Sequence, residues 1–249
     1  MSYISVGGAT TYPYVNILSS GPSIPPVITD GLMMYLDASV ASSLQDPNWL
    51  DLSGRNNNGL LINGPTFQPT NGGVITMDGV NDKVHVADTT DFNFNNEFTY
   101  QIAFNSTLFS SYRNLMVHRG SRQRIGIWTN GSRLYREVSN NGRVKNSAGN
   151  TSLSVSLNTW YIITLVLNTN KVLKIFRNLT SQTLSTNMDG LFTDQTGPLE
   201  LGSHGGFPQN FQGDMAFALV YNRGLSQLEI EHNYNLLKTR LGIWENILL

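Results

Sequence analysis

Basic residues are concentrated in one stretch of this chain, where their side chains could bind an anion. Eight of the sixteen Lys and Arg residues fall within 33 consecutive positions, and Glu137 is the one acidic residue there. The eight are Arg113, Arg119, Arg122, Arg124, Arg133, Arg136, Arg143 and Lys145. Guanidinium groups bind carboxylates and phosphates through paired hydrogen bonds, and the rings of Trp128 and Tyr135 offer surfaces on which a sugar can stack. This stretch therefore indicates binding of an anionic partner, either a glycan or a protein.

A β-hairpin is predicted to position these side chains, because Asn130-Gly131 is a strong signal for a two-residue turn. The cross-strand pairs that this turn predicts are Trp128 with Arg133, Gly126 with Tyr135 and Arg124 with Glu137. Side chains alternate between the two faces of a strand. One exposed face is therefore expected to carry the candidate ligand-binding residues Arg122, Arg124, Trp128, Arg133 and Tyr135. The core-facing side is expected to carry Ile125, Ile127 and Leu134, together with Arg136. The alternative is a solvated face held by Arg–Trp and Arg–Glu cross-strand pairs.

Motifs for catalysis are not found in the sequence. The chain contains no cysteine, which excludes disulfides, thiol chemistry, zinc fingers and iron–sulfur sites. The four histidines, His85, His118, His204 and His232, lack the spacing of metal ligands. No serine, histidine and aspartate form a recognisable nucleophile elbow. We therefore expect a protein that is not an enzyme.

Composition and charge limit the classes of fold and partner. Charged residues make up 13% of the chain, about half the usual share, while glycine occurs 23 times. This balance favours short strands joined by tight turns and excludes a coiled coil or helical bundle. The net charge of −1 argues against nucleic-acid binding driven by overall charge. The apolar segment 161–167 is far shorter than the roughly 20 residues needed to span a bilayer, so membrane insertion is not expected.

The first 29 residues are predicted to form an extended docking arm, followed by one domain over residues 30–249. Four prolines in the arm disfavour a helix, and no charged residue precedes Asp30. The arm is expected to bury its apolar side chains against a partner surface, for example by adding a strand to a sheet edge. The candidate assembly contacts are Tyr12, Tyr14, Val15, Ile17 and Leu18.

Strand-like segments follow one another from Asp30 onward. Residues 98–104 place four apolar side chains at period two, as in a half-buried strand. Segments 161–167 and 172–176 are separated by four turn-forming residues and predict a hairpin. Residues 215–221 are apolar on both faces, which predicts a central strand. One helix is expected over 227–240, with a capping box at Ser226 and Glu229, and it is expected to cover a sheet edge or the bottom of a sandwich.

Five motifs in this order resemble the concanavalin A-like, or laminin-G-like, domains found in phage and other viral structural proteins. They are Asp30-Gly-Leu-Met-Met-Tyr-Leu-Asp-Ala38, Trp49-Leu-Asp-Leu-Ser-Gly-Arg-Asn-Asn-Asn-Gly59, Met77-Asp-Gly-Val-Asn-Asp82, Asn158-Thr-Trp-Tyr161, and Phe211-Gln-Gly213 with Val220-Tyr-Asn-Arg-Gly-Leu-Ser226. The resemblance covers roughly residues 30–242. It implies an all-β fold in which two antiparallel sheets form a jelly-roll sandwich. The same fold hosts lectins, glycosidases and packing modules, so it does not decide the function.

The resemblance also suggests two kinds of site. Glycosidases of this fold carry paired glutamates as Glu-x-Asp-x-Glu, because retaining hydrolysis needs two carboxyl groups about 5–5.5 Å apart. None of the six glutamates here forms that pattern. Many relatives bind calcium through an Asp pair after Phe-x-Gly, whereas this chain has Asp214 followed by apolar residues. Asp78, Asp82 and Asp214 are kept as weak candidate ligands, with turn stabilisation as the alternative.

These observations lead to two hypotheses about function. The first is a non-enzymatic structural protein of the virion surface, made in the host cytoplasm, which decorates a capsid or forms a head or tail appendage. Its arm would contact other virion proteins, and it would be a homo-oligomer or present in many copies. The second is a carbohydrate-binding adhesin or tail-fibre module that recognises host-surface glycans. Loss of glycan binding on Trp128→Ala is expected to decide between them.

Overall fold

The structure, a computed structural model, describes residues 26–94, 97–119, 124–140, 144–185, 188, 196–203 and 209–243. The five candidate assembly contacts, Tyr12, Tyr14, Val15, Ile17 and Leu18, lie outside the described residues, as does Arg122. Within the described part, residues 26–29 already pack on the domain, because Val27 is buried and the Ile28 backbone N–H donates to the Asn233 Oδ1 (2.9 Å). The boundary between arm and domain at residue 30 stays a prediction.

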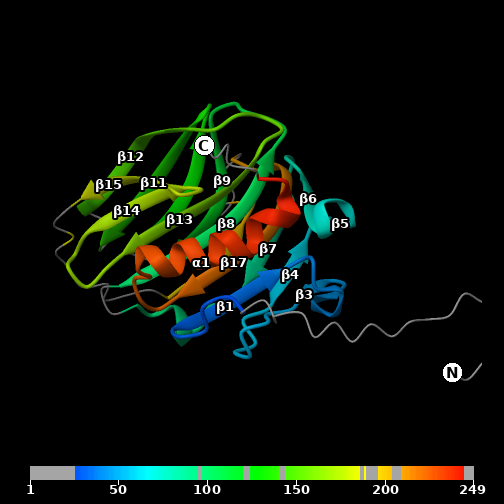
Figure 1. Cartoon of the computed structure of the whole chain (residues 1–249). Coiled ribbons are helices and arrows are strands. Elements are labelled where there is room, and N and C mark those ends of the chain that lie inside the picture. Colours follow the sequence, from blue (N-terminus) through cyan, green and yellow to red (C-terminus); the bar gives the residue numbers. More distant parts are fainter. Residues whose placement is uncertain are drawn as a thin grey trace, which may run out of the picture.

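Two antiparallel sheets pack face to face and form a sandwich, which confirms the expected fold class (Figure 1). The first, which we name the helix-side sheet, has the order β15-β14-β13-β8-β17-β6-β5, with β1 also paired to β17. Its strands are β1 (Leu32–Asp37), β5 (Thr66–Gln68), β6 (Val74–Asp78), β8 (Phe98–Ser106), β13 (Trp160–Leu167), β14 (Leu173–Arg177), β15 (Thr180–Ser185) and β17 (Gln212–Tyr221). The predicted hairpin of β13 and β14 and the central place of β17 are both confirmed.

The second sheet, which we name the hairpin-side sheet, has the order β12-β11-β10-β9-β16-β7-β4-β3-β2. Its strands are β2 (Leu44–Gln45), β3 (Asn48–Trp49), β4 (Gly59–Ile62), β7 (Lys83–Val86), β9 (Tyr112–Arg119), β10 (Arg124–Asn130), β11 (Arg133–Asn140), β12 (Val144–Ser154) and β16 (Leu199–Leu201). Four short 3-10 helices complete the described elements: η1 (Ala41–Ser43), η2 (Thr70–Gly72), η3 (Thr90–Phe92) and η4 (Thr239–Leu241). The predicted basic hairpin is β10 and β11, near one end of this sheet.

The main core lies between the sheets, and its side chains follow the period-two pattern. Phe98, Tyr100, Ile102 and Phe104 of β8 all point into it, as their spacing predicted. However, β8 is buried on both faces rather than half-buried, because Gln101 and Ala103 on its other face are also covered. The cover on that face is supplied by the helix.

The helix α1 (Gln227–Lys238) lies across the outer face of the helix-side sheet (Figure 1). Its apolar stripe, including Ile230, Tyr234 and Leu237, forms a second core with side chains such as Phe217 and Tyr221 of β17. The expected position at a sheet edge or at the sandwich bottom was therefore wrong. An apolar stripe along a helix shows which side of the helix is buried, but it does not show which surface the helix covers.

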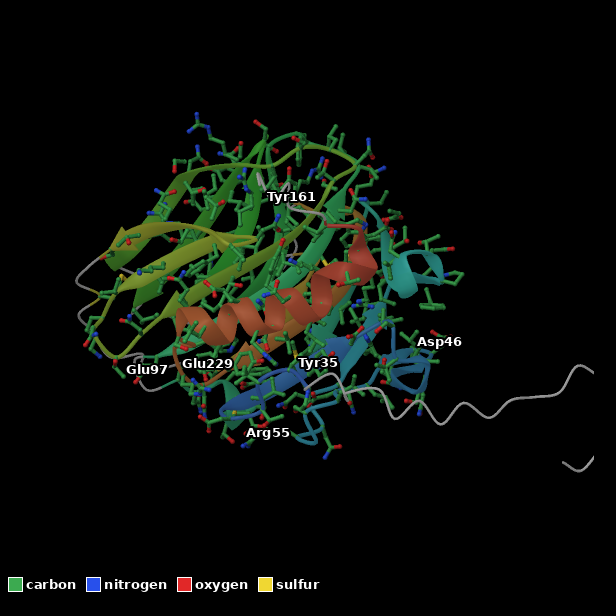
Figure 2. All side chains as sticks on the ribbon, in the orientation of Figure 1. Tyr35, Asp46, Arg55, Glu97, Tyr161 and Glu229 are labelled. Atoms are coloured by element: carbon green, nitrogen blue, oxygen red, sulfur yellow. The ribbon has the colours of Figure 1, made fainter. Side chains whose placement is uncertain are left out.

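Both ends of α1 follow the sequence signals. The Ser226 side chain accepts from the Glu229 backbone N–H, and the Glu229 carboxylate accepts from the Ser226 backbone N–H, so the capping box is confirmed. Figure 2 shows Glu229 at this first turn. Two hydrogen bonds from Arg223, of 2.6 and 3.1 Å, are the main reason that the pKa of Glu229 falls to about 2. Gly242 (φ 63°) adopts the left-handed conformation that ends the helical segment. Among the described helices, none combines the length and apolarity needed to cross a bilayer.

Candidate functional site

The hairpin of β10 and β11 forms where the sequence predicts it, but with a different pairing. Asn130 pairs with Arg133, so the two loop residues are Gly131 and Ser132. Gly131 has a positive φ of 56°, whereas Asn130 stays in the strand. Glycine at the first loop position with positive φ is typical of a type II′ turn, while the prediction had centred the turn on Asn130-Gly131.

The corrected pairing brings different side chains together on the same face. Trp128 is opposite Tyr135 instead of Arg133, Gly126 is opposite Glu137, and Arg124 is opposite Ser139. Because each partner moves by two residues, every side chain keeps the face that the sequence predicted. Arg124, Trp128, Arg133 and Tyr135 therefore share the outer face of the hairpin-side sheet, and Ile125, Ile127 and Leu134 point into the core.

Three aromatic rings form a cluster on this outer face. The rings of Trp128 and Tyr135 lie 5.8 Å apart at 78°, and those of Tyr112 and Tyr135 lie 5.0 Å apart at 85°. Edge-to-face rings at these separations stabilise one another. Tyr112, on β9, was not among the predicted site residues. It reaches the cluster because β9 pairs with β10 in a register that is shifted near Trp128, and no signal within the hairpin itself predicts that shift.

Trp128 is the buried member of the cluster, with only 3% of its surface exposed, so its predicted exposure was wrong. Its indole lies over Gly126, where a Cβ atom would come within 2.3 Å of the ring. Glycine thus leaves the space that the indole fills. Tyr112 and Tyr135 remain half-buried and accessible, so the ring surface available to a ligand comes from the tyrosines, with Trp128 supporting Tyr135.

Charged side chains on this face differ in whether they are neutralised. Arg124 donates to Glu137 across the hairpin (3.2 Å), and Lys83 donates to Glu200 further along the sheet (2.6 Å). Arg133 is exposed, and its guanidinium forms no ion pair within the described part of the chain. Asn130 is opposite Arg133 and Asn150 is opposite Tyr135, and the two amides are joined by a hydrogen bond of 3.1 Å. Asn150 is a second residue that the sequence reasoning missed.

Arg136 points to the core side of its strand, as predicted, and the structure shows how this is tolerated. It is opposite Gly149, where a Cβ atom would lie 3.1 Å from Nη1, and Nη1 donates to the Asn150 carbonyl at 3.5 Å. Burial lowers the pKa of this guanidinium. Arg136 is therefore part of the packing of the hairpin and does not belong to the outer face.

Burial is also the main cause of the raised pKa of Tyr135, and the Glu137 carboxylate adds to it. The phenol therefore stays protonated at neutral pH and can donate or accept a hydrogen bond. Among the described residues, this face therefore offers two accessible tyrosine rings, two amides and the guanidinium of Arg133, which together can stack on a ring and hydrogen-bond to its substituents.

The three weak metal candidates act as local hydrogen-bond acceptors. Asp78 accepts from the Val80 backbone N–H (2.7 Å), and Asp82 accepts from the Asp78 backbone N–H (3.0 Å), so both stabilise their turn. Asp214 accepts from the Thr76 hydroxyl at 2.6 Å. No group of three or more acidic or histidine side chains suited to a metal occurs among the described residues. The contacts of Asp78 and Asp82 are those of the turn-stabilising alternative, whereas Asp214 bonds between strands β17 and β6.

Solved structures with the same fold include toxin binding domains, a sialidase and one domain of an arabinanase. The binding domain of Paraclostridial Mosquitocidal Protein 1 aligns with a TM-score of 0.69 at 19% identity, covering 83% of this chain and 52% of that one. Trypanosoma rangeli sialidase in complex with sialic acid aligns with a TM-score of 0.66 at 16% identity, covering 90% of this chain and 35% of that one.

A third neighbour matches this chain over nearly its own full length. It is domain 4 of AbnA, an extracellular arabinanase of Geobacillus stearothermophilus in complex with arabinotriose, with a TM-score of 0.63 at 13% identity. The alignment covers 83% of this chain and 98% of that domain. By contrast, this chain spans about half the length of the mosquitocidal binding domain and about a third of the sialidase. At these identities the similarity shows the fold alone.

The sequence comparisons give a family but no close relative. No curated protein matches the chain. The family model for the concanavalin A-like lectin/glucanases superfamily matches residues 78–231, which include β8 to β11, β13, β17 and the start of α1. The chain therefore belongs to the concanavalin A-like lectin/glucanases superfamily.

Proposed function

We propose that this domain binds an anionic glycan on the outer face of the hairpin-side sheet and does not cleave it. The observation that carries the proposal is the fixed pair of accessible tyrosines, Tyr112 and Tyr135, next to the unpaired cation of Arg133. Two solved structures of the same fold support a binding role by analogy. AbnA domain 4 is in complex with arabinotriose, and the binding domain of botulinum neurotoxin DC is in complex with SialylT.

The tyrosines provide the stacking surface. Their edge-to-face contact holds each ring in one orientation, so little side-chain entropy is lost when a sugar ring stacks on them. Trp128 packs against Tyr135 from the side of Gly126 and limits the movement of that ring. The apolar face of a sugar can therefore meet a surface that is already organised.

Arg133 provides the preference for negative charge. The charges of Arg124 and Lys83 are offset by Glu137 and Glu200, whereas Arg133 has no ion pair within the described part of the chain and can still pair with a carboxylate or sulfate. Arg133 lies on the same face of β11 as Tyr135, two residues away. A sugar stacked on the tyrosines would therefore place an acidic substituent within reach of this guanidinium.

The arrangement of carboxylates supports binding without hydrolysis. Glu137 and Glu200 face the same side of the sheet in one row, with Gly126 and Val117 between them. Three strand spacings separate their backbone positions by about 14 Å, and each carboxylate is tied to its own cation, whereas glycosidases place two carboxyl groups no more than about 9.5 Å apart. The two cations are Arg124 and Lys83.

Display on a virion surface is the location that we propose for this activity, and it rests on the sequence resemblance to viral structural proteins. An acidic protein of the same particle is the second candidate partner, because an unpaired Arg133 suits an acidic side chain as well as an acidic sugar. Binding of glycans by the purified protein separates the two.

A glycan array probed with the full chain tests the proposal. We expect binding to acidic glycans that weakens with added salt and falls about tenfold or more, about 1.4 kcal/mol, in Tyr135→Ala and in Arg133→Gln. Phe67→Ala and Lys174→Gln are the matched controls, since Phe67 is an exposed aromatic residue (45%) and Lys174 a half-buried cation, both on the helix-side sheet. Trp128→Ala is a less informative variant than expected, because a buried indole cannot contact the ligand directly.

Two results would contradict the proposal. The first is an array with no glycan bound above background at any salt concentration. The second is binding that Tyr135→Ala and Arg133→Gln leave unchanged while the controls also bind normally. Hydrolysis of any bound oligosaccharide would contradict the non-enzymatic part alone.

A further inference from the structure

An open cavity of about 440 Å³ lies on the helix side of the sandwich, between β1, α1 and residues 26–29. Tyr35, which Figure 2 shows on β1 alongside α1, lies at this cavity, and Leu52 and Leu236 are only half-buried beside it. The volume falls within the range of sites that enclose small organic molecules, so several apolar side chains fit there. The apolar wall consists of Val27, Leu32, Leu52, Leu236 and Leu237.

The charged groups at the cavity already have partners within the domain. The Asp37 carboxylate accepts from the Ser39 backbone N–H (2.8 Å) and hydroxyl (2.7 Å), from Arg240 Nη2 (2.8 Å) and from the Tyr35 hydroxyl (2.7 Å), which saturates it. Arg240 is neutralised by Asp37, and its Nε and Nη1 atoms lie beneath the surface, where an occupant does not reach them. The occupant must therefore bind by burial of apolar surface and should carry no charge.

Residues 26–28 lead the chain to this cavity and are fixed there by α1. The Ile28 backbone N–H donates to Asn233 Oδ1 (2.9 Å), and the Pro26 carbonyl oxygen lies 2.9 Å from Nε2 of His232. Pro26 and Val27 themselves line the cavity, and Val27 is buried. The residues that precede Pro26 are therefore tethered at the rim of the cavity.

The sequence before Pro26 has the chemistry that the cavity requires. Residues 1–25 contain no charged side chain, and residues 12–18 include five apolar ones. Residues 19–25 join that segment to Pro26 and contain Gly21-Pro22, a turn signal that allows the chain to reverse. These seven residues reach about 25 Å when extended, which exceeds the roughly 18 Å length of the 12-residue helix α1. The linker is therefore long enough to return residues 12–18 to the cavity.

Addition of the arm as a strand beside β1 is not available, because that edge of β1 is already paired. The Tyr35 backbone N–H donates to Asp51 Oδ1 (2.8 Å), and the Tyr35 carbonyl accepts from the Leu52 backbone N–H (2.8 Å). Contact at this place must therefore be made by side chains that enter the cavity.

We propose that residues 12–18, which lie outside the described residues, dock in this cavity of their own chain and bury apolar side chains against Leu52 and Leu236. The arm of the same chain has an advantage over that of a second copy, because a short tether gives it an effective concentration on the order of millimolar. While docked, the arm cannot contact another protein, so the cavity competes with any assembly partner for it. This inference does not depend on the proposed glycan face.

Disulfide trapping in the full chain tests the docking, and no native thiol competes because the chain has no cysteine. Leu236→Cys is paired with a cysteine in the arm, and Leu228→Cys, at a position 77% exposed on the same helix, is the matched control. A disulfide needs Cα atoms within about 7 Å of each other. Under air oxidation we expect at least one arm position to couple to Leu236→Cys about fivefold or more faster than to Leu228→Cys, with the bond inside one chain. The arm variants are Tyr12→Cys, Tyr14→Cys, Val15→Cys, Ile17→Cys and Leu18→Cys.

Cleavage by chymotrypsin, which cuts after aromatic residues, gives a second measurement. Docking protects Tyr12 and Tyr14, so Leu236→Glu, which places a charge in the cavity, should speed cleavage there about fivefold or more. Leu228→Glu adds the same charge outside the cavity and should leave the cleavage rate unchanged. The melting temperatures of both variants report whether the domain stays folded.

Three results would overturn the proposal. One is coupling to Leu236→Cys that is no faster than coupling to Leu228→Cys at all five arm positions. Another is a disulfide that joins two chains, because the cavity would then hold the arm of a second copy. The third is cleavage at Tyr12 and Tyr14 that stays unchanged in a folded Leu236→Glu variant.

Discussion

Gly126→Ala tests whether the indole of Trp128 is fixed against the hairpin. In the structure a Cβ atom at Gly126 would lie 2.3 Å from Cη2 of Trp128, 2.6 Å from Cζ3 and 2.8 Å from a methyl group of Val117. Carbon atoms pack at about 3.5–4.0 Å. The added methyl group therefore overlaps the ring by more than 1 Å, which a rotation of Val117 alone does not relieve.

Two effects of opposite sign determine how much Gly126→Ala changes the free energy of unfolding. Overpacking of this kind costs about 1–3 kcal/mol. Alanine also restricts the unfolded chain more than glycine does, and this contributes about 0.5–1 kcal/mol in its favour within a strand. We therefore expect Gly126→Ala to lower the free energy of unfolding by about 1 kcal/mol, within a range of about 0–2.5 kcal/mol. If the indole could move aside freely, the same substitution would stabilise the protein.

Urea denaturation measures the free energy of unfolding of four proteins: the wild type, Gly126→Ala, Trp128→Leu and the double variant. Because leucine lacks the distal ring, the two substitutions are expected to couple by about 1–2 kcal/mol, with Gly126→Ala much less harmful in the Trp128→Leu background. Gly126→Ala should also weaken glycan binding, since a displaced indole no longer supports Tyr135. A stabilised Gly126→Ala variant, or additive effects in the double variant, would refute the packing described for Trp128.

Three further predictions concern other parts of the fold. Because the pKa of Glu229 is lowered to about 2 in the folded state, its stabilising effect is complete above the ordinary carboxyl pKa and is lost as the pH falls from about 4.5 to 2. At pH 7 the free energy of unfolding of Glu229→Gln should therefore be about 1–2 kcal/mol lower than that of the wild type, after allowing for solvent screening. The difference between the urea midpoints of the two proteins should close near pH 2. A difference that does not change with pH would contradict this prediction. Asn233→Ala should lower the free energy of unfolding by about 2–3 kcal/mol, because the buried amide accepts from the Ile28 backbone N–H and donates to the Tyr221 hydroxyl. A loss below about 0.5 kcal/mol in urea unfolding would count against this prediction. Calcium addition or chelation should shift the melting temperature by less than about 1 °C, and a larger rise with calcium would show that the acidic residues bind it after all.

Local sequence signals were sufficient for most elements of this fold. The period-two pattern of residues 98–104 identified the core face of β8, and the Ser226/Glu229 capping box identified the start of α1. Each of these signals depends on neighbours close in sequence. The burial of the second face of β8 depends instead on where α1 docks, a contact between segments more than 100 residues apart, and the pattern of either segment alone does not contain it.

The candidate site shows the same division between local and distant causes. Which side chains share the outer face was predictable, because alternation along a strand survives a register shift of two residues. The identity of the accessible rings was not predictable from the hairpin alone. Trp128 is buried because it lies over Gly126 and beside Val117 of β9, and Tyr112 reaches Tyr135 through the shifted register of β9. The accessible rings on this face are therefore those of Tyr112 and Tyr135, and in the proposed function they stack on the ligand in place of the tryptophan.

The most direct test of the central claim is a crystal structure of the full chain with the glycan that binds best on the array. The predicted result is a sugar ring stacked on Tyr112 or Tyr135, with an acidic substituent paired to Arg133 and no break in the glycosidic bond. A glycan located on another surface, such as the cavity beside α1 or the edge strand β5, with Tyr135 and Arg133 unoccupied, would contradict the claim.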